Sequence, residues 1–210
     1  MTLPTIDSSA RAAPRERSAN DWYREPVWAI EGLLDVQRFS GLTLDPACGS
    51  GTIPTTFEAR GLSCHGADLV DRAGGDYAVM DFLTETRAGA VDNVVTNPPF
   101  DLAEAFLSRA LRLARHKVAF LLRLSWLEGR SRIWVYDSTP LCAVHPFAAR
   151  VSMPPGGMDI EPKGGAVAFA WYVWDHSHPV GAPAVIRRVE RSPKQKGPHR
   201  LAADEAPVPG

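Results

Sequence analysis

A glycine-rich stretch at residues 45–52 could hold a nucleotide-like ligand. It reads Asp-Pro-Ala-Cys-Gly-Ser-Gly-Thr and follows a short apolar run at 42–44. A strand, a glycine turn and a helix together bring backbone N–H groups and a positive helix end to one point. The stretch lacks the lysine of a phosphate-binding GxxxxGK(S/T) loop. It begins instead with Asp45, whose carboxylate suits a cationic ligand group such as an ammonium.

Two further acidic residues stand at the ends of the next strands expected along the chain. Asp68 follows the run at 62–67, and Asp81 follows the run at 77–80. In dinucleotide-binding folds an acid at the second strand end hydrogen-bonds the ribose hydroxyls, which predicts that role for Asp68. Asp81 is placed to accept a hydrogen bond from an adenine amino group, while Phe82 flanks the ring. The inferred ligand therefore has a ribose, an adenine and a cationic amino-acid end.

The tetrapeptide Asn97-Pro98-Pro99-Phe100 could hold a planar amino group. An exocyclic adenine amine is a poor nucleophile, because its lone pair is delocalised into the ring. The Asn97 side-chain carbonyl and the Pro98 backbone carbonyl could accept its two N–H groups and favour a more tetrahedral nitrogen. The two prolines fix φ and stiffen these acceptors, and Phe100 offers a stacking face worth ~1–3 kcal/mol. This chemistry needs neither a metal nor a strong general base.

A mostly parallel sheet would bring these stretches together. Apolar runs bounded by turn residues predict strands at 42–44, 62–67, 77–80, 91–96, 118–124, 141–144 and 166–174. Helical spacing and glycine stops predict helices at 26–39, 52–60, 102–115 and 126–136. The β–α alternation indicates an α/β fold with a doubly wound sheet and helices on both faces. Such sheets bind ligands at the carboxyl ends of their strands, where both motifs stand.

The composition is that of a globular protein. The chain has 210 residues, of which 45% are hydrophobic and 22% charged, enough for one good-sized core. The formal net charge of −1 gives no overall nucleic-acid signature, and no apolar run approaches the ~20 residues that span a bilayer. The three cysteines lack CxxC spacing, which predicts no metal site and favours a cytoplasmic location.

The two ends of the chain differ from the middle. We expect residues 1–19 to be a disordered leader, 20–178 to form the folded domain, and 179–210 to be a basic extension of low order. The run from 185 to 200 carries six basic residues against one Glu, and either a solvated tail or a phosphate-binding tail would explain it. The proline- and glycine-rich segment 153–165 predicts a long functional loop.

The two motifs together resemble the S-adenosylmethionine-dependent amino-methyltransferases, above all the N6-adenine type found in phages and prophages. Asp-Pro-Ala-Cys-Gly-Ser-Gly precedes Asn-Pro-Pro-Phe in the order and separation of that family, and the likeness covers about residues 20–176. It implies a class I methyltransferase fold, which is Rossmann-like with a seven-stranded sheet. It also implies S-adenosylmethionine as the cofactor, with the methionine end at the first motif and catalysis at the second.

The resemblance assigns expected roles to individual residues. The catalytic group comprises Asn97, Pro98, Pro99 and Phe100. The expected cofactor site combines residues that follow the first three predicted strands with one residue ahead of the first helix and one after the fourth strand. Its members are Tyr23, Asp45, Pro46, Ala47, Cys48, Gly49, Gly51, Thr52, Asp68, Leu69, Asp81, Phe82 and Asn97.

One position departs from the family pattern. Glu25 stands where many relatives carry a threonine that contacts the cofactor carboxylate, and a glutamate there would repel that group. The acceptor also stays open at this stage. DNA adenine is favoured over RNA adenine; a protein glutamine is a further candidate, although those relatives usually carry an N-terminal helical domain. A catalytically silent binding protein is the remaining alternative, and the intact Asn97 and Phe100 argue against it.

Overall fold

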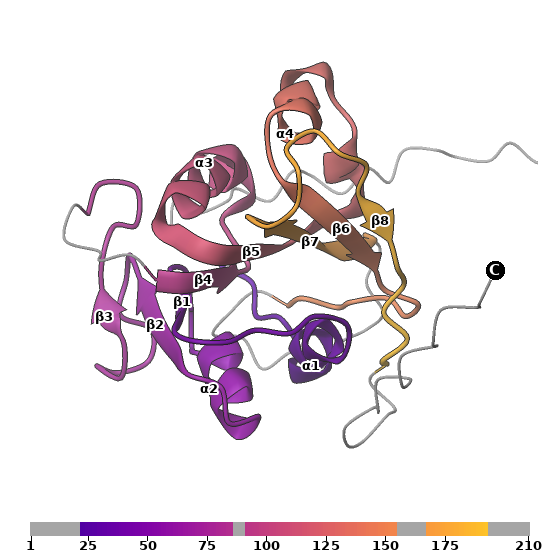
Figure 1. Cartoon of the computed structure of the whole chain (residues 1–210). Coiled ribbons are helices and arrows are strands. Elements are labelled where there is room, and N and C mark those ends of the chain that lie inside the picture. Colours follow the sequence, from indigo (N-terminus) through magenta and orange to yellow (C-terminus); the bar gives the residue numbers. More distant parts are fainter. Residues whose placement is uncertain (1–21, 86–90, 155–166, 193–210) are drawn as a thin grey trace, which may run out of the picture.

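One twisted sheet organises the protein. The structure, a computed structural model, describes residues 22–85, 91–154 and 167–192. The expected leader at 1–19, most of the predicted 153–165 loop and the tail from 193 lie outside these residues. Figure 1 shows the sheet crossing the molecule, with strand order β3-β2-β1-β4-β5-β7-β6-β8. The strands are β1 Thr43–Asp45, β2 Cys64–Asp68, β3 Ala78–Val79, β4 Val91–Thr96, β5 Ala114–Arg123, β6 Leu141–Pro146, β7 Phe169–Asp175 and β8 Val185–Ile186.

The sheet is mostly parallel. Strands β1 to β5 pair in parallel, and β1 lies between β2 and β4. Strand β7 runs antiparallel to both of its neighbours, β5 and β6, while β8 pairs parallel with β6. The order reverses at β1 and β4, because the chain moves outward to β2 and β3 before it returns. The carboxyl ends of β1 and β4 therefore lie side by side at the switch point of the sheet.

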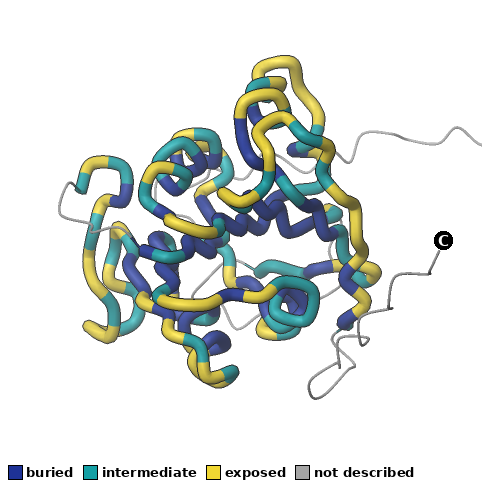
Figure 2. Tube along the Cα trace, viewed as in Figure 1, coloured by how far each residue is buried: buried dark blue, intermediate teal, exposed yellow. Residues whose placement is uncertain are grey.

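Helices cover both faces of the sheet, as the α/β prediction requires. The helices are α1 Val27–Val36, α2 Thr52–Ala59, α3 Ala103–Leu113 and α4 Ile133–Asp137. On one face, α1 and α2 bury Ile30, Leu33 and Phe57 against the sheet. On the other, α3 and α4 bury Leu107 and Val135. Figure 2 shows the strands between these layers as the most deeply buried part of the chain.

Strand β5 shows why the sheet must be covered twice. Its residues Val118, Phe120 and Leu122 pack with the α3 side, whereas Ala119 and Leu121 pack with the α1 and α2 side. All five are at most 1% exposed. Because successive side chains of a strand point to opposite faces, a continuous apolar run of this kind is stable only inside a two-sided core.

The structure corrects three sequence predictions. The sheet has eight strands rather than seven, because the two-residue strand β8 joins its edge. The helix predicted at 126–136 is instead two short 3₁₀ turns, Leu124–Leu127 and Arg130–Arg132, followed by the five-residue α4. Gly129, with φ of 112°, separates the two turns in a conformation that only glycine adopts readily. Strand β5 begins at Ala114, four residues before the predicted start.

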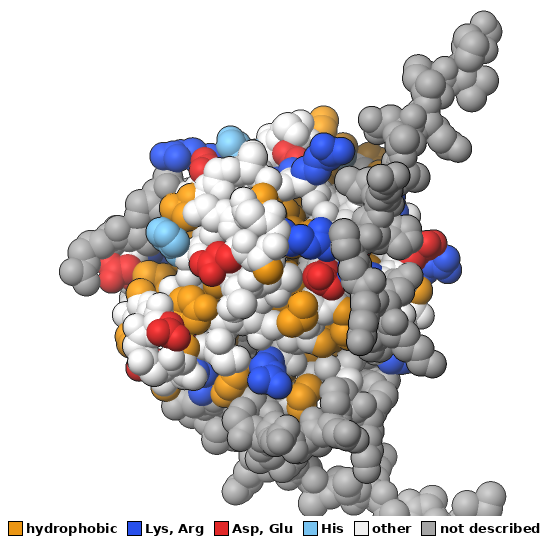
Figure 3. Space-filling model, turned by 90° about the horizontal axis from the view of Figure 1, so that it is seen from below, with side chains coloured by type: hydrophobic (Ala, Val, Ile, Leu, Met, Phe, Trp, Pro, Cys, Tyr) orange, Lys and Arg blue, Asp and Glu red, His pale blue; other side chains and the backbone are white. Residues whose placement is uncertain are grey.

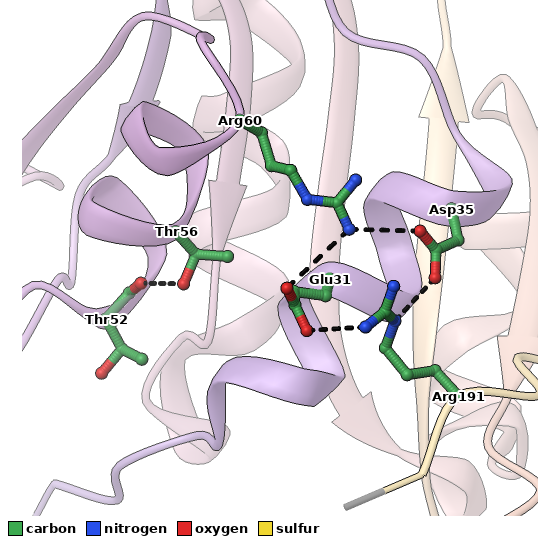
Figure 4. A network of polar contacts seen from close by, with 6 residues as sticks. All are labelled: Glu31, Asp35, Thr52, Thr56, Arg60 and Arg191. Carbon is green, nitrogen blue, oxygen red and sulfur yellow. Dashed lines mark hydrogen bonds and ion pairs between the residues drawn. The ribbon is translucent and has the colours of Figure 1, made fainter. Parts of the chain in front are cut away.

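The segment 179–192, expected to be part of a low-order extension, lies against the domain. Val189 and Arg191 are 1% and 2% exposed. Arg191 donates from Nε to Asp35 Oδ2 at 2.7 Å and from Nη1 to Glu31 Oε2 at 2.8 Å (Figure 4). Arg60, which directly follows α2, reaches the same two carboxylates from the other side, at 3.3 Å from Asp35 and 3.9 Å from Glu31. Arg191 is therefore a structural residue that joins the end of the described chain to α1, and its guanidinium is not free for phosphates.

The described side chains on the α1 and α2 side of the molecule form no cluster of positive charge. Figure 3 views the molecule from the side of α1 and α2, and the Lys, Arg, Asp and Glu side chains drawn there are scattered among apolar ones. Among the described residues, no helix has the length and apolarity needed to cross a membrane.

We expect Arg191→Ala to lower the free energy of unfolding by about 3 kcal/mol, because it removes the buried guanidinium that pairs with two partly buried carboxylates. Chemical unfolding would measure this. Arg188→Ala is the matched control, since Arg188 is 64% exposed and pairs only with nearby Glu190 among the described residues. It should change stability by less than about 0.5 kcal/mol. Equal effects of the two substitutions would contradict the anchoring role.

Candidate active site

A cavity lies at the carboxyl ends of the central strands, at the switch point of the sheet. It has a volume of about 470 Å³. The loop after β1, the loop after β2, the segment after β3 and the Asn-Pro-Pro-Phe turn after β4 all line it. The extended segment 22–25, ahead of α1, supplies a further wall. The volume falls in the range of small-molecule sites, ~300–1,000 Å³.

The loop after β1 folds tightly because two glycines take conformations that other residues avoid. Gly49 has φ of 55° and Gly51 has φ of 86°. A Cβ on Gly49 would lie 2.6 Å from the ring of Trp22, and a Cβ on Gly51 would lie 2.2 Å from the Tyr77 hydroxyl. The aromatic rings thus press directly on the loop backbone, and α2 begins at once after it, at Thr52.

Asp68 ties the end of β2 to this glycine loop. Its Oδ2 accepts a hydrogen bond from the Gly49 N–H at 2.8 Å, and its Oδ1 accepts one from Val70 N–H at 3.2 Å. Arg72 approaches Oδ1 at 3.6 Å and lies over the Trp22 ring, 5.4 Å from its centroid. Asp68 lines the cavity and shapes the loop at the same time.

The segment after β3 forms the outer end of the cavity. Asp81 is exposed at its mouth, with Oδ1 accepting a hydrogen bond from Leu83 N–H at 2.9 Å. Phe82 is only 2% exposed and packs on Phe106 of α3, with ring centroids 5.0 Å apart. Leu69, by contrast, is 59% exposed on the other wall. A planar ring could be held between apolar side chains here, beside one carboxylate.

Asn97 is held by its amide nitrogen. Its Nδ2 donates to the Tyr23 carbonyl and to Glu25 Oε2, both at 3.1 Å, and Met153 Sδ lies 3.7 Å away. Its Oδ1 is buried and accepts no hydrogen bond from the described residues. A buried acceptor without a donor is costly, by ~1–3 kcal/mol, and a ligand that supplies the donor would remove this cost.

Two carboxyl groups at this end of the sheet are buried: Glu25, which bonds to Asn97, and Asp45, the last residue of β1. Glu25 is 6% exposed and Asp45 is 0% exposed. Burial raises the pKa of Glu25 to about 7, despite the opposing hydrogen bonds from its own backbone and from Asn97 and the charge of Arg24. Burial, reinforced by the negative charge of Glu25, raises the pKa of Asp45 well above its usual value. This corner of the site therefore favours positive charge.

Phe100 lies at the junction of several aromatic groups. The Tyr23 ring stacks on it at 6.2 Å, and Phe169 of β7 lies at 6.1 Å. The Arg123 guanidinium, at the end of β5, lies over the ring at 4.9 Å. The ring is partly buried, so any stacking partner would have to share it with these neighbours.

The structure gathers most of the predicted site residues around the one cavity. Those lining it are Tyr23, Pro46, Ala47, Cys48, Gly49, Asp68, Leu69, Asp81, Phe82, Asn97, Pro98, Pro99 and Phe100. Three are placed elsewhere. Asp45 is fully buried beneath the loop, while Gly51 and Thr52 line a separate cavity of about 580 Å³ between α1 and α2.

The sequence did not predict every residue of the cavity wall. Trp22, Arg72, Met80 and Phe106 also line it. Trp22 stands in the stretch that resembles the methyltransferases, so its position was a usable signal. Arg72 comes four residues after Asp68 in a segment without regular structure, which gave no pattern to detect. In the described ranges no group of three His, Cys, Asp or Glu side chains is arranged to hold a metal ion.

Comparison with known proteins identifies the fold. No protein-family model and no curated protein matches the sequence. Among solved structures, the chain is similar to a protein from Vibrio vulnificus described as the modification subunit of a type I restriction enzyme. The TM-score is 0.58 at 15% identity, over 83% of this chain and 48% of that one. The chain thus spans about half the length of that subunit.

Two other solved structures agree. A protein from Pyrococcus horikoshii described as an RNA methyltransferase gives a TM-score of 0.53 at 16% identity, over 73% of this chain and 85% of that one. The M protein of the type I restriction enzyme EcoKI gives 0.52 at 14% identity, over 74% and 44%. At these identities the likeness establishes the fold alone. The protein has the Rossmann-like fold of the class I methyltransferases, which confirms the predicted fold class.

We expect Gly49→Ala to displace Trp22 and to destabilise the loop. Gly74→Ala is the matched control, because Gly74 also has positive φ, 72°, but a Cβ there would meet nothing within 4 Å. Both substitutions strain the backbone, and only Gly49→Ala adds a collision. Its free energy of unfolding should fall by about 1–2 kcal/mol more than that of the control. Equal losses in chemical unfolding would show that Trp22 does not press on the loop.

Proposed function

We propose that the protein is an S-adenosylmethionine-dependent N-methyltransferase whose acceptor is an exocyclic amino nitrogen, most specifically N6 of adenine in DNA. The observation that carries the proposal is Asn97 Oδ1, a buried acceptor that has no hydrogen-bond donor within the described ranges. It stands at the end of β4, beside the cavity that the glycine loop after β1 also lines. A hydrogen-bond acceptor for an amine and a loop suited to a nucleoside ligand thus meet at one point.

The cavity residues fit the cofactor. Bound there, S-adenosylmethionine would supply a methyl group activated on a sulfonium. The loop at 46–49 would hold the amino-acid end, near the buried carboxyls that favour positive charge. Asp68 would bind the ribose hydroxyls, in addition to the Gly49 N–H that it already accepts. Asp81 and Phe82 would receive the adenine at the outer end of the cavity.

The catalytic work falls to the turn after β4. Asn97 Oδ1 and the Pro98 carbonyl would accept the two N–H groups of the target amine. Rigid acceptors in this arrangement concentrate the nitrogen lone pair toward the methyl group, which is electrostatic preorganisation. Phe100 would contact the face of the base. The proton leaves to water after transfer, so no strong base is required.

A nucleic acid is the acceptor that the comparisons favour. Two of the similar structures are described as components of type I restriction enzymes, and one as an RNA methyltransferase. Because adenine N6 is inaccessible in a stacked duplex, the enzyme would act on a flipped base. Incubation with labelled cofactor and separate DNA, RNA and protein pools tests the proposal. Label in adenine of DNA supports it, label only in RNA or protein redirects it, and no label in any pool contradicts it.

Asn97→Ala should reduce methyl transfer by about 100-fold or more, because it removes an acceptor that acts on the reacting amine. Cofactor affinity, measured by calorimetry, should stay within about threefold of the wild type, since the proposed contact is to the acceptor. A comparable loss of cofactor binding would contradict this division of roles.

Asp68→Ala should have the opposite profile and weaken cofactor binding by ~10-fold or more, because a charged hydrogen-bonding group is lost. Asp71→Ala is the control: Asp71 is exposed in the same loop and accepts hydrogen bonds from the nearby backbone N–H groups of Ala73 and Gly75. Unchanged affinity in Asp68→Ala would show that the carboxylate serves the loop and not the ligand.

A further inference from the structure

Glu25 is an unusual residue to find beside a catalytic amide. It is buried, it forms no ion pair among the described residues, and its side chain bonds to the Asn97 amide nitrogen. A buried carboxyl without a cation is unfavourable for folding. Its place in the wall of the cavity therefore calls for a functional explanation. A glutamate at this position would repel the cofactor carboxylate, so contact with that carboxylate does not explain it.

The geometry gives such an explanation. A side-chain amide has two ends of similar shape, and its partners decide which end faces which way. Here the amide nitrogen faces two acceptors, the Tyr23 carbonyl and Glu25 Oε2. If the amide turned over, Asn97 Oδ1 would face both of these oxygens and the contact would be repulsive. The planar amide then fixes Oδ1 on the side away from Glu25.

We propose that Glu25 is a positioning residue for methyl transfer, which together with the Tyr23 carbonyl holds the Asn97 amide nitrogen and so presents Oδ1 to the acceptor amine. This rests on the proposed function, since it assumes that Asn97 binds the amine. It gives Glu25 a role toward the acceptor, in place of the cofactor contact expected at that position.

The role depends on the ionisation of Glu25. A carboxylate only accepts hydrogen bonds, and so it enforces one orientation of the amide. A carboxylic acid also donates, and its O–H could bond to Oδ1 of a turned amide, so the constraint is lost as pH falls through the pKa. That pKa is raised to about 7, so the change in ionisation falls within the pH range of an ordinary enzyme assay.

The neighbouring charges modify this titration. Arg24 on the same segment favours the carboxylate, and the buried Asp45 at the end of β1 opposes it. Glu31 and Arg60, of opposite charge, stand in the second cavity that Glu25 also borders. A bound cationic cofactor would favour the carboxylate further. The loss of activity at acid pH (the acid limb of the pH profile) should therefore be clearest in kcat/KM, which reports ionisation of the free enzyme.

The first experiment compares two substitutions at this site. Glu25→Ala should lower kcat by ~10-fold or more while cofactor affinity changes much less, because the amide is no longer oriented. Glu25→Gln keeps an oxygen that can accept from Asn97 Nδ2. It should retain more activity than Glu25→Ala and lose the acid limb near pH 7. An unchanged kcat in Glu25→Ala, or a loss of cofactor binding that matches the loss of kcat, would overturn the proposal.

A donor–acceptor exchange provides a sharper test. Asn97→Asp keeps an acceptor for the amine but sets a carboxylate against Glu25, and it should be strongly impaired. Adding Glu25→Gln restores one donor and one acceptor in the pair, with their roles exchanged. The double variant should recover at least ~10-fold over Asn97→Asp. No recovery in a folded double variant, as judged by thermal unfolding, would overturn the proposal.

A measurement without any acceptor separates this proposal from the proposed function. The side-chain amide resonances of Asn97, assigned by their absence in Asn97→Ala, should titrate near pH 7 in the wild type and not in Glu25→Gln. Glu58→Gln, on the exposed side of α2, is the control and should titrate like the wild type. Absence of titration in the wild type overturns the role of Glu25. Titration in a protein that methylates no acceptor would leave the contact intact and refute only the proposed function.

Discussion

The parallel pairing of β1 with β4 is the contact on which the site depends. Thr43 lies opposite Asn93 and Leu44 opposite Val94, so both strands end at the same edge. Polar side chains secure this register: Asn93 Nδ2 donates to the Ser40 carbonyl at 2.8 Å, and Asp92 Oδ2 accepts from Leu42 N–H at 2.8 Å. A shift of one residue would turn each buried side chain to the wrong face. The glycine loop and the Asn-Pro-Pro-Phe turn meet because this pairing is fixed.

Electrostatics set a second constraint at the same place. Glu25 lines the cavity and Asp45 is buried at the end of β1, and neither carboxyl has a paired cation among the described residues. Their elevated pKa values show that this arrangement is unfavourable in the ionised state. A protein retains such groups where they interact with something else, and a positively charged ligand would relieve the repulsion. The unfavourable burial of these two carboxyl groups is expected where a protein binds a ligand.

The sequence was sufficient to predict most of the fold, because the signals were local. Strand β4 was placed at its observed bounds, and α2 began where the turn at Gly51 required. The positions of Asp68 and Asn97 followed, since Asp68 ends β2 and Asn97 comes directly after β4. What it could not predict depends on long-range contacts. Strand β8 consists of two residues, both exposed, which is too short a run to predict a strand, and its formation depends on pairing with β6. The hydrogen bond between Glu25 and Asn97 joins residues 72 positions apart, so no spacing rule could reveal it.

The contact between Arg191 and α1 has a consequence for synthesis of the chain. Arg191 and Glu31 are 160 residues apart, and the helix that carries Glu31 and Asp35 is the first one described. During translation these two carboxylates leave the ribosome long before their main cation exists. Arg60 can pair with them in the interval, at 3.3 and 3.9 Å in the finished structure. The growing chain therefore has a provisional partner for the two carboxylates of α1. The native ion pairs of Glu31 and Asp35 with Arg191 can form only after residue 191 has been synthesised.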